Sequence, residues 1–100
     1  MTSPSAEIVM YRTPFCPYCI RAADLLRRKA ARVREVDVSG DPAARKWLLE
    51  STRSPTVPQI FINGVSVGGF DEIAALDRRG LLDSLLAEAP PVLAPAVSNP

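Results

Sequence analysis

Two cysteines three residues apart are the feature that most constrains this chain. Cys16 and Cys19 are its only cysteines, and its 100 residues contain no histidine. A structural zinc site needs four protein ligands, and a secreted disulfide framework needs more cysteines at wider spacing. The absence of histidine also excludes Ser-His and Cys-His catalysis. Thiol redox chemistry remains as the chemistry that this pair can perform.

The residues around the pair predict a strand, a turn and a helix. The run from Glu7 to Arg12 is predicted as a short buried strand, which Thr13-Pro14 ends. Pro17 then occupies the first position of an amphipathic helix that extends to about Lys29. Apolar residues recur along this helix at three- or four-residue spacing, namely Ile20, Ala23, Leu26 and Ala30.

A second strand and a second helix are predicted next. The strand is Val33 to Val38. Asp41-Pro42 combines an N-cap residue with a proline at the first helical position, which indicates a helix start. This helix is expected to stop near Ser51 and to turn Trp47 and Leu48 inward.

A hairpin and two further helices complete the chain. Asn63-Gly64 favours a type I′ turn between short strands at Gln59 to Ile62 and Val65 to Val67. Helices are then expected from Asp71 to about Asp77 and over the leucines at 81–86, with Gly80 between them.

The element order β-α-β-α-β-β-α-α predicts an α/β fold. The first two strands flank a helix and should be parallel, whereas the hairpin makes the other pair antiparallel. A four-stranded mixed sheet flanked by helices is therefore the expected architecture.

Composition limits the domain count and the kind of partner. Net charge is only +1, which disfavours nucleic-acid binding, and no apolar run approaches the ~20 residues of a membrane span. We expect a single domain at residues 7–87, an N-terminal tail at 1–6 and a mobile Pro/Ala-rich tail at 88–100. With no signal or transit peptide recognised, a cytoplasmic monomer is the default expectation.

The position of the cysteines predicts a different role for each. Cys16 falls at the helix N-cap, where free N–H groups and the helix dipole favour a thiolate. In C-x-x-C motifs the pKa of the first thiol typically falls from ~8.5 to about 3.5–7.5. Cys19 lies one turn later, packed toward the core. Cys16 is therefore predicted to attack and Cys19 to resolve.

Three separated motifs make the chain similar to the glutaredoxin family, in its dithiol class. They are Cys16-Pro17-Tyr18-Cys19, Thr56-Val57-Pro58, and Gly68-Gly69 followed by Phe70-Asp71-Glu72. The resemblance runs from about Glu7 to Leu86. It implies a thioredoxin fold and glutathione as the reductant, with no bound cofactor and no metal.

The resemblance also implies which residues bind glutathione. Pro58 would be a cis-proline facing the thiols, with Thr56 beside the groove and the backbone of Val57 pairing with the cysteinyl part of glutathione. Tyr18 would form one wall. The γ-glutamyl end would be held by Gly69, Phe70 and Asp71, although Asp71 is equally an N-cap candidate.

Two positions depart from the family pattern. Many members have a lysine three residues before the first cysteine, where this chain has Thr13. Arg12 or Arg53, or both, are expected to bind the glycine carboxylate instead. Many relatives also have cysteine at the position of Phe70, which removes a thiol but no backbone contact.

The function that the resemblance implies is glutathione-dependent thiol–disulfide exchange. Its substrates would be glutathionylated proteins and proteins with disulfides. One alternative is a thioredoxin-like reductant served by a reductase, which Pro17-Tyr18 and Gly68-Gly69 disfavour. Another is a dimer that holds a [2Fe–2S] cluster through Cys16 and two glutathiones, which Pro17 disfavours.

Overall fold

A four-stranded mixed sheet of order β2-β1-β3-β4 forms the centre of the fold. In the computed structural model, which describes residues 5–90, β1 (Ile8–Arg12) runs parallel to β2 (Val33–Asp37). β3 (Gln59–Ile62) is antiparallel to β1, and β4 (Val65–Gly68) is antiparallel to β3. The predicted sheet is therefore confirmed, including its one parallel pair.

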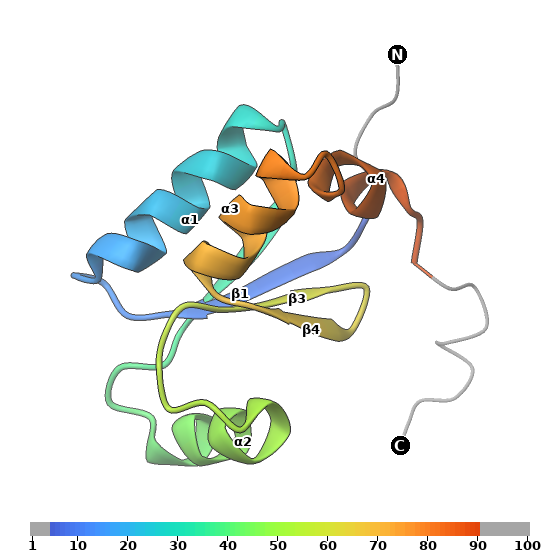
Figure 1. Cartoon of the computed structure of the whole chain (residues 1–100). Helices are drawn as coiled ribbons and strands as arrows, with labels where there is room; N and C mark the ends of the chain where they lie inside the picture. The colour runs from blue at the N-terminus through green and yellow to red at the C-terminus, as the bar shows by residue number, and fades with distance from the viewer. Residues whose placement is uncertain (1–4, 91–100) are drawn as a thin grey trace.

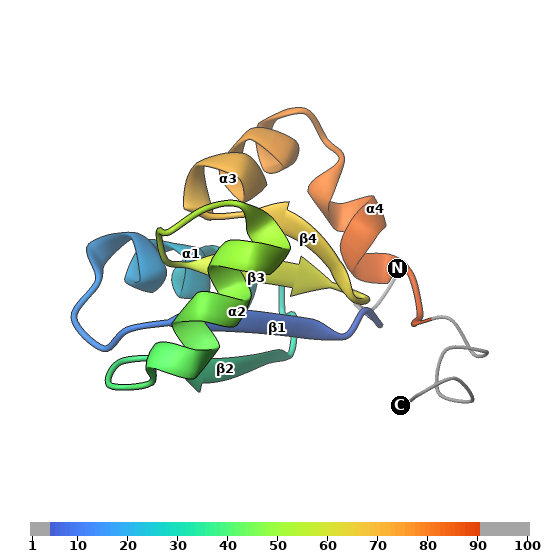
Figure 2. The same cartoon turned by 90° about the horizontal axis from the view of Figure 1, so that it is seen from below.

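The helices lie on both faces of this sheet (Figure 1). One face carries α1 (Pro17–Arg28), α3 (Phe70–Arg78) and α4 (Leu82–Ala87), and the other carries α2 (Pro42–Thr52). Figure 2, which shows the molecule from below, has α2 in front of the strands and lying across them. This arrangement confirms the α/β class and the predicted element order. No helix in the described part of the chain is long and apolar enough to cross a membrane.

The main hydrophobic core lies between the sheet and α1, α3 and α4. β1, β3 and the three helices contribute fully buried side chains, among them Met10, Leu26, Ile60, Ile73 and Leu82. Because apolar burial is the dominant favourable term in folding, this layer holds the first turn of α1 against the sheet.

The buried face of α1 differs from the predicted one. Ala23 and Leu26 are buried as expected, but Ile20 is 48% exposed, and Ala30 lies beyond the helix with a φ of 59°. The buried stripe begins one residue earlier, at Cys19, because the first turn presents that side to the sheet. The buried residues of α1 are Cys19, Ala22, Ala23, Leu25 and Leu26.

Trp47 faces the sheet as predicted, but its side chain is not buried. Leu48 is buried, but Trp47 is 46% exposed. Its ring stacks on Phe61 with centroids 5.8 Å apart and lies 5.4 Å from the ring of Tyr11. Trp47 thus covers the α2 face of the sheet with one side of its ring and leaves the other side accessible, as amphipathic aromatic rings often do.

The local turn and cap predictions are confirmed. The side chain of Asp41 accepts a hydrogen bond from Ala44 N at 3.0 Å at the start of α2. Asn63 and Gly64 both have positive φ, 51° and 82°, as a type I′ turn requires.

The ends of the described chain are tied to the hairpin and to α4. Asn63 Oδ1 accepts from Glu7 N at 2.8 Å, and Asn63 Nδ2 donates to the Glu88 carbonyl at 3.0 Å. The backbone N–H groups of Ser5 and Ala6 both donate to the Leu86 carbonyl. The rest of the two predicted tails, residues 1–4 and 91–100, lies outside the described residues.

An ion-pair cluster joins the three helices of one face. Lys29 Nζ, just past α1, lies 2.6 Å from Asp77 Oδ1 in α3 and 3.0 Å from Asp83 Oδ1 in α4. The hydrogen bonds to Asp77 and Asp83 raise the pKa of Lys29. The cluster therefore keeps α1 and α3 side by side at the end of the molecule opposite their N-termini.

We predict that Leu26→Ala lowers the free energy of unfolding by about 2–5 kcal/mol, because Leu26 is fully buried and its truncation leaves a cavity. The matched control is Leu49→Ala, since Leu49 is 46% exposed. It should change that free energy by no more than about 0.5 kcal/mol. Chemical denaturation followed by far-ultraviolet circular dichroism measures both. Equal losses in the two variants would contradict the location of the core.

Candidate active site

Cys16 is the N-cap residue of α1, as the sequence predicts. Its φ and ψ are −106° and 113°, in the extended region, and helical geometry starts at Pro17. The sulfur accepts a hydrogen bond from Cys19 N at 3.2 Å. A thiol thus takes the place of the oxygen that usually caps a helix, at the positive end of the helix dipole.

The surroundings of Cys16 favour its thiolate. Burial raises its pKa, but a hydrogen bond from the Cys19 thiol, backbone hydrogen bonds from Cys19 and Tyr18, and the charge of Arg12 lower it. The lowering effects prevail, and the pKa of Cys16 lies below the ordinary thiol value. A half-buried thiol in this state is the nucleophile that disulfide exchange requires.

Cys19 is in the opposite state. It is buried in the first turn of α1, and burial, followed by its hydrogen bond to Cys16, raises the pKa of Cys19 to about 11. Both cysteines are free thiols. Since Cys19 keeps its proton near neutral pH, the pair combines one sulfur that can attack a disulfide with one that stays protonated.

The loop before β3 lies directly beside the nucleophile. The Val57–Pro58 peptide bond is cis, as the resemblance implies. The Cys16 thiol lies 3.8 Å from the carbonyl oxygen of Val57, to which it donates when protonated. Gln59 is buried, and its Nε2 donates to the Thr56 carbonyl at 2.8 Å. This hydrogen bond ties the cis-proline loop to the start of β3.

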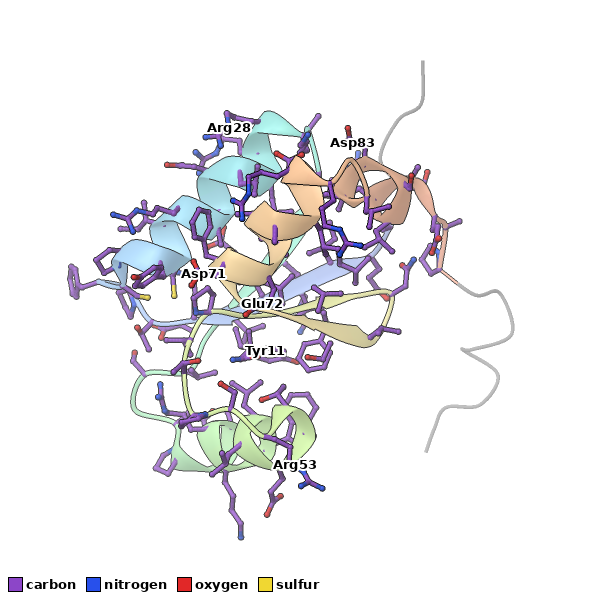
Figure 3. The ribbon with its side chains drawn as sticks, in the orientation of Figure 1. Tyr11, Arg28, Arg53, Asp71, Glu72 and Asp83 are labelled. Carbon is purple, nitrogen blue, oxygen red and sulfur yellow. The ribbon has the colours of Figure 1, made fainter. Side chains whose placement is uncertain are left out.

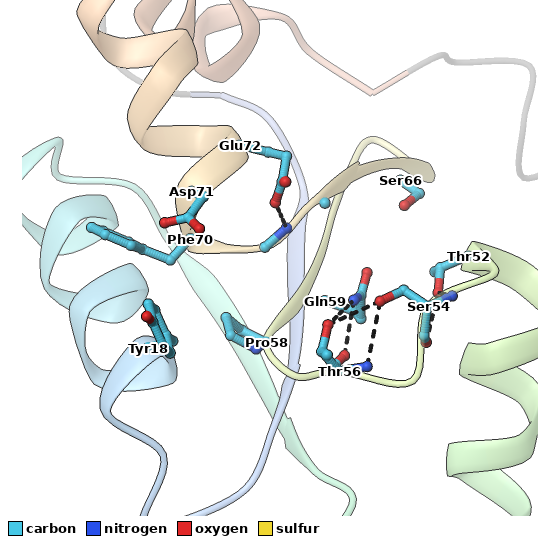
Figure 4. Close-up of a pocket in the computed structure, with 12 residues that line it drawn as sticks. Tyr18, Thr52, Ser54, Thr56, Pro58, Gln59, Ser66, Phe70, Asp71 and Glu72 are labelled. Atoms are coloured by element: carbon cyan, nitrogen blue, oxygen red, sulfur yellow. Dashed lines mark hydrogen bonds between the residues drawn. The ribbon is translucent and has the colours of Figure 1, made fainter.

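A pocket of about 540 Å³ opens over this loop. Figure 4 shows Tyr18 and Phe70 at one end, Pro58 in the middle, and Thr52 and Ser66 at the other end. Half of the predicted site residues line it: Tyr18, Thr56, Pro58, Gly69, Phe70 and Asp71. Cys16 and Val57 are not among the lining residues, but they contact each other in the cis-proline loop next to the pocket.

The start of α3 forms the upper wall of the pocket. Its N-cap is Gly69, whose N–H donates to Glu72 Oε1 at 2.7 Å (Figure 4). The alternative of Asp71 as N-cap is therefore wrong, because the helix begins one residue before it. A Cβ on Gly69 would lie 2.9 Å from the Pro58 carbonyl oxygen, so only glycine lets the two loops approach this closely.

Two aromatic rings form the outer wall. The rings of Tyr18 and Phe70 have centroids 6.5 Å apart, and the Arg21 guanidinium lies 5.3 Å from the Tyr18 centroid. Tyr18 is half-exposed and leaves one edge free for a ligand. The predicted wall is thus built by residues of α1 and α3 together.

Arg12 and Arg53, the two residues predicted for the glycine carboxylate, do not line the pocket, and neither does Thr13. Arg12 Nη1 forms an ion pair with Glu35 Oε1 at 2.7 Å, and Arg12 Nε donates to the Thr13 carbonyl at 3.4 Å. Arg53 has a φ of 62° at the C-cap of α2. Figure 3 shows Arg53 on the face of the sheet opposite Asp71. Their part in glutathione binding stays a prediction.

Sequence reasoning missed six residues that line the pocket: Thr52, Ser54, Gln59, Ser66, Gly68 and Glu72. One carried a usable signal, because Glu72 stands three residues after Gly69, the spacing of a capping box. Thr52 and Ser54 gave none. They line the pocket because the Thr52 hydroxyl bonds to Leu48 O and Ser54 O and shapes the end of α2.

The glutaredoxin family model matches residues 8–67, which include both cysteines and the cis-proline loop. A glutaredoxin of Pseudomonas aeruginosa is 48% identical over 80 residues, covering 80% of this chain and 95% of the relative. Glutaredoxin 3 of Escherichia coli is 42% identical over 81 residues, covering 81% and 98%.

Solved structures give the same result for the fold. A glutaredoxin from Brucella melitensis has a TM-score of 0.75 at 46% identity, covering 85% of this chain and 91% of that one. A buckwheat glutaredoxin in complex with glutathione has a TM-score of 0.77 at 30% identity, covering 81% and 76%. With its thioredoxin fold, its N-cap cysteine and its cis-proline, this chain belongs to the glutaredoxin family of thiol–disulfide oxidoreductases.

Proposed function

We propose that this protein uses glutathione to reduce protein–glutathione mixed disulfides and protein disulfides. The observation that carries the proposal is the Cys16 sulfur, which is stabilised as a thiolate at the start of α1 beside the cis-proline loop and the pocket. The buckwheat relative was solved with glutathione, which supports this tripeptide as the ligand.

The proposed reaction on a glutathionylated protein has two exchanges. The Cys16 thiolate attacks the glutathione sulfur, a Cys16–glutathione disulfide forms, and the protein leaves as a thiolate. The thiolate of a second glutathione then attacks the glutathione sulfur of this mixed disulfide. Cys16 is released as a thiolate, and glutathione disulfide is the oxidised product.

Protein disulfides require Cys19 in addition. Cys16 attacks one sulfur of the substrate and forms a mixed disulfide, while the other substrate sulfur leaves as a thiolate. Cys19 loses its proton, attacks Cys16 and releases the second substrate thiolate. Two glutathiones then reduce the Cys16–Cys19 disulfide. The hydrogen bond from Cys19 N to the Cys16 sulfur at 3.2 Å supports this step, because it keeps that sulfur against the turn of α1 that carries Cys19.

The pocket supports a specific placement of glutathione. Its cysteinyl part would pair with the backbone of Val57, opposite Cys16, with Thr56 and Pro58 beneath it. Its γ-glutamyl part would lie against Gly69, Phe70 and Asp71 at the start of α3, where backbone N–H groups and a carboxylate are close together. Tyr18 would cover the ligand. We propose that the protein acts in the cytoplasm as a monomer.

We predict that Cys19→Ser keeps near-wild-type turnover on a glutathione mixed disulfide but loses most activity on a protein disulfide, since only the second reaction needs a resolving thiol. Cys16→Ser should lose both activities. The measurement is glutathione oxidation coupled to NADPH and glutathione reductase, with β-hydroxyethyl disulfide as the first substrate. Loss of both activities in Cys19→Ser would contradict the division of roles.

Alkylation should also distinguish the two thiols. Because the pKa of Cys16 is lowered and that of Cys19 is raised to about 11, Cys16 holds the larger thiolate fraction at pH 7. In the reduced, folded protein, iodoacetamide should therefore label Cys16 alone, as read by peptide mass spectrometry. Both residues should be labelled after denaturation, which is the control. Equal labelling of the two in the folded protein would count against the site.

Gly69→Ala should raise the KM for glutathione about tenfold, equivalent to ~1.4 kcal/mol of lost binding. The reason is that the new Cβ would lie 2.9 Å from the Pro58 carbonyl and would push the two pocket walls apart. Gly64→Ala is the control, because a Cβ there meets no atom within 4 Å and the strain from its φ of 82° falls on the hairpin turn, at the opposite end of the strands. An unchanged KM in Gly69→Ala would argue against glutathione binding in this pocket.

A further inference from the structure

The pocket extends beyond the part proposed for glutathione. Tyr18, which stands between the two cysteines in the sequence, lines one end, whereas Thr52 and Ser66 line the other (Figure 4). This second part is the far end of the pocket, and its lining residues are Thr52, Ser54, Gln59 and Ser66. None of them has a part in the proposed placement of glutathione. A ligand that extends past that position would contact the far end.

Gln59 provides a buried hydrogen-bond acceptor at the far end. The residue is only 3% exposed, and its Nε2 donates to the carbonyl and to the hydroxyl of Thr56. No group in the described part of the chain donates to its Oε1. In Figure 4 this oxygen points away from Thr56. Because buried polar atoms are normally hydrogen-bonded, Oε1 favours a ligand that brings a donor.

The charge of the pocket favours a cationic donor. Asp71 and Glu72 contribute two carboxylates, and no lysine or arginine of the described chain is among the lining residues. Two arginines nearby are engaged elsewhere. The Arg21 guanidinium lies over an aromatic ring of the outer wall, and Arg45 Nη2 donates to a backbone carbonyl of the loop before β3. An ammonium or guanidinium group would therefore meet acceptors and negative charge without a competing cation in the lining.

The proposed placement of glutathione indicates which part of a protein substrate reaches the far end. The cysteinyl part of glutathione pairs with the backbone of Val57, and the γ-glutamyl part, which precedes the cysteine, lies at the start of α3. A cysteine of a protein substrate that pairs with Val57 in the same way directs its preceding residues along the same path. A side chain on the N-terminal side of that cysteine then extends toward the far end.

We propose that the far end of the pocket binds a lysine or arginine side chain that precedes the reacting cysteine of a protein disulfide. The cationic group donates to Gln59 Oε1 and is attracted by the carboxylates of Asp71 and Glu72. The site therefore selects among protein disulfides by the sequence before the cysteine. The inference rests on the proposed function, because it takes Cys16 as the attacking thiol and Val57 as the partner of the substrate cysteine.

The experiment measures an exchange equilibrium with Cys19→Ser, whose single thiol is Cys16. The protein starts as a mixed disulfide with 2-mercaptoethanol. A peptide thiolate attacks the Cys16 sulfur, mercaptoethanol leaves as a thiolate, and intact-protein mass spectrometry measures the two species. The peptides are isomers with one cysteine and one lysine, the lysine standing at successive positions before or after the cysteine. The same peptides equilibrated with hydroxyethyl disulfide alone correct for the reactivity of each peptide thiol.

Lysine before the cysteine should raise the corrected equilibrium constant about threefold to tenfold at its best position, compared with lysine at the same distance after the cysteine. Norleucine in place of that lysine should remove the gain. Equal constants for the isomers would overturn the proposal, because attraction by the general charge of the protein does not depend on the side of the cysteine.

Ser66→Lys tests whether the preference arises at the far end. Gln59 ties the cis-proline loop to β3, so a change at Gln59 would also disturb that loop. Ser66 is exposed, and a lysine there brings a cation into the far end. This variant should lose most of the preference. Val65→Lys is the matched control, because Val65 is 64% exposed on the same strand and does not line this pocket. It should keep the preference. An undiminished preference in Ser66→Lys would overturn the location.

Salt provides a second measurement that needs no change in the pocket. Added salt screens charge–charge attraction, so the preference for lysine in Cys19→Ser should fall as ionic strength rises. A preference that does not respond to salt would contradict the role of the two carboxylates. The two proposals also fail separately. Glutathione turnover without a lysine preference would reject this inference alone, whereas a lysine preference without glutathione turnover would reject glutathione as the reductant and leave the far-end site standing.

Discussion

The hydrogen bond from Cys19 N to the Cys16 sulfur is the interaction on which the site depends. It exists because α1 begins at Pro17, which leaves Cys16 in extended geometry as the N-cap. The N–H groups of the first turn have no partner within the helix, so they are available to an anion. The same turn buries Cys19 against the core. One helix start thus lowers the pKa of one thiol and raises that of the other.

The sheet explains why the remaining parts of the site meet at this helix start. β1 and β3 are antiparallel, with Tyr11 opposite Gln59, so the thiol loop after β1 lies beside the cis-proline loop before β3. The hairpin then returns β4 to the same end, where Gly68 pairs with Ile60. α3 starts there for that reason. Three segments far apart in the chain therefore form one pocket without any long loop.

Local signals predicted much of the fold because each acts within a few residues. The proline at the start of α1, the cap at Asp41 and the turn at Asn63-Gly64 are confirmed. Errors arose where burial depends on distant partners. Trp47 packs on Tyr11 and Phe61 of the sheet and is still 46% exposed, an extent of burial that the sequence of α2 alone does not contain. Ile20 faces outward because the first turn buries Cys19 instead.

The site shows the same limit. The roles of the two cysteines were predictable from the helix start, whereas the cis-proline at Pro58 and the site position of Gly69 were predicted from the resemblance to the glutaredoxin family. The surroundings of Arg12 were not, because its contact with Glu35 joins residues 23 positions apart through the pairing of β1 with β2. The wall formed by Thr52 and Ser54 likewise depends on how α2 ends. The positions of Arg12, Thr52 and Ser54 in the folded chain, more than their residue types, decide what each side chain contacts.

The most direct test of the account is the ultraviolet titration of the single thiol in Cys19→Ser, followed at 240 nm, where thiolates absorb. The pKa of Cys16 should lie below the ordinary thiol value in the folded protein and return to that value when the protein is denatured. An ordinary pKa in both states would show that the start of α1 does not stabilise the thiolate, and the account would be wrong.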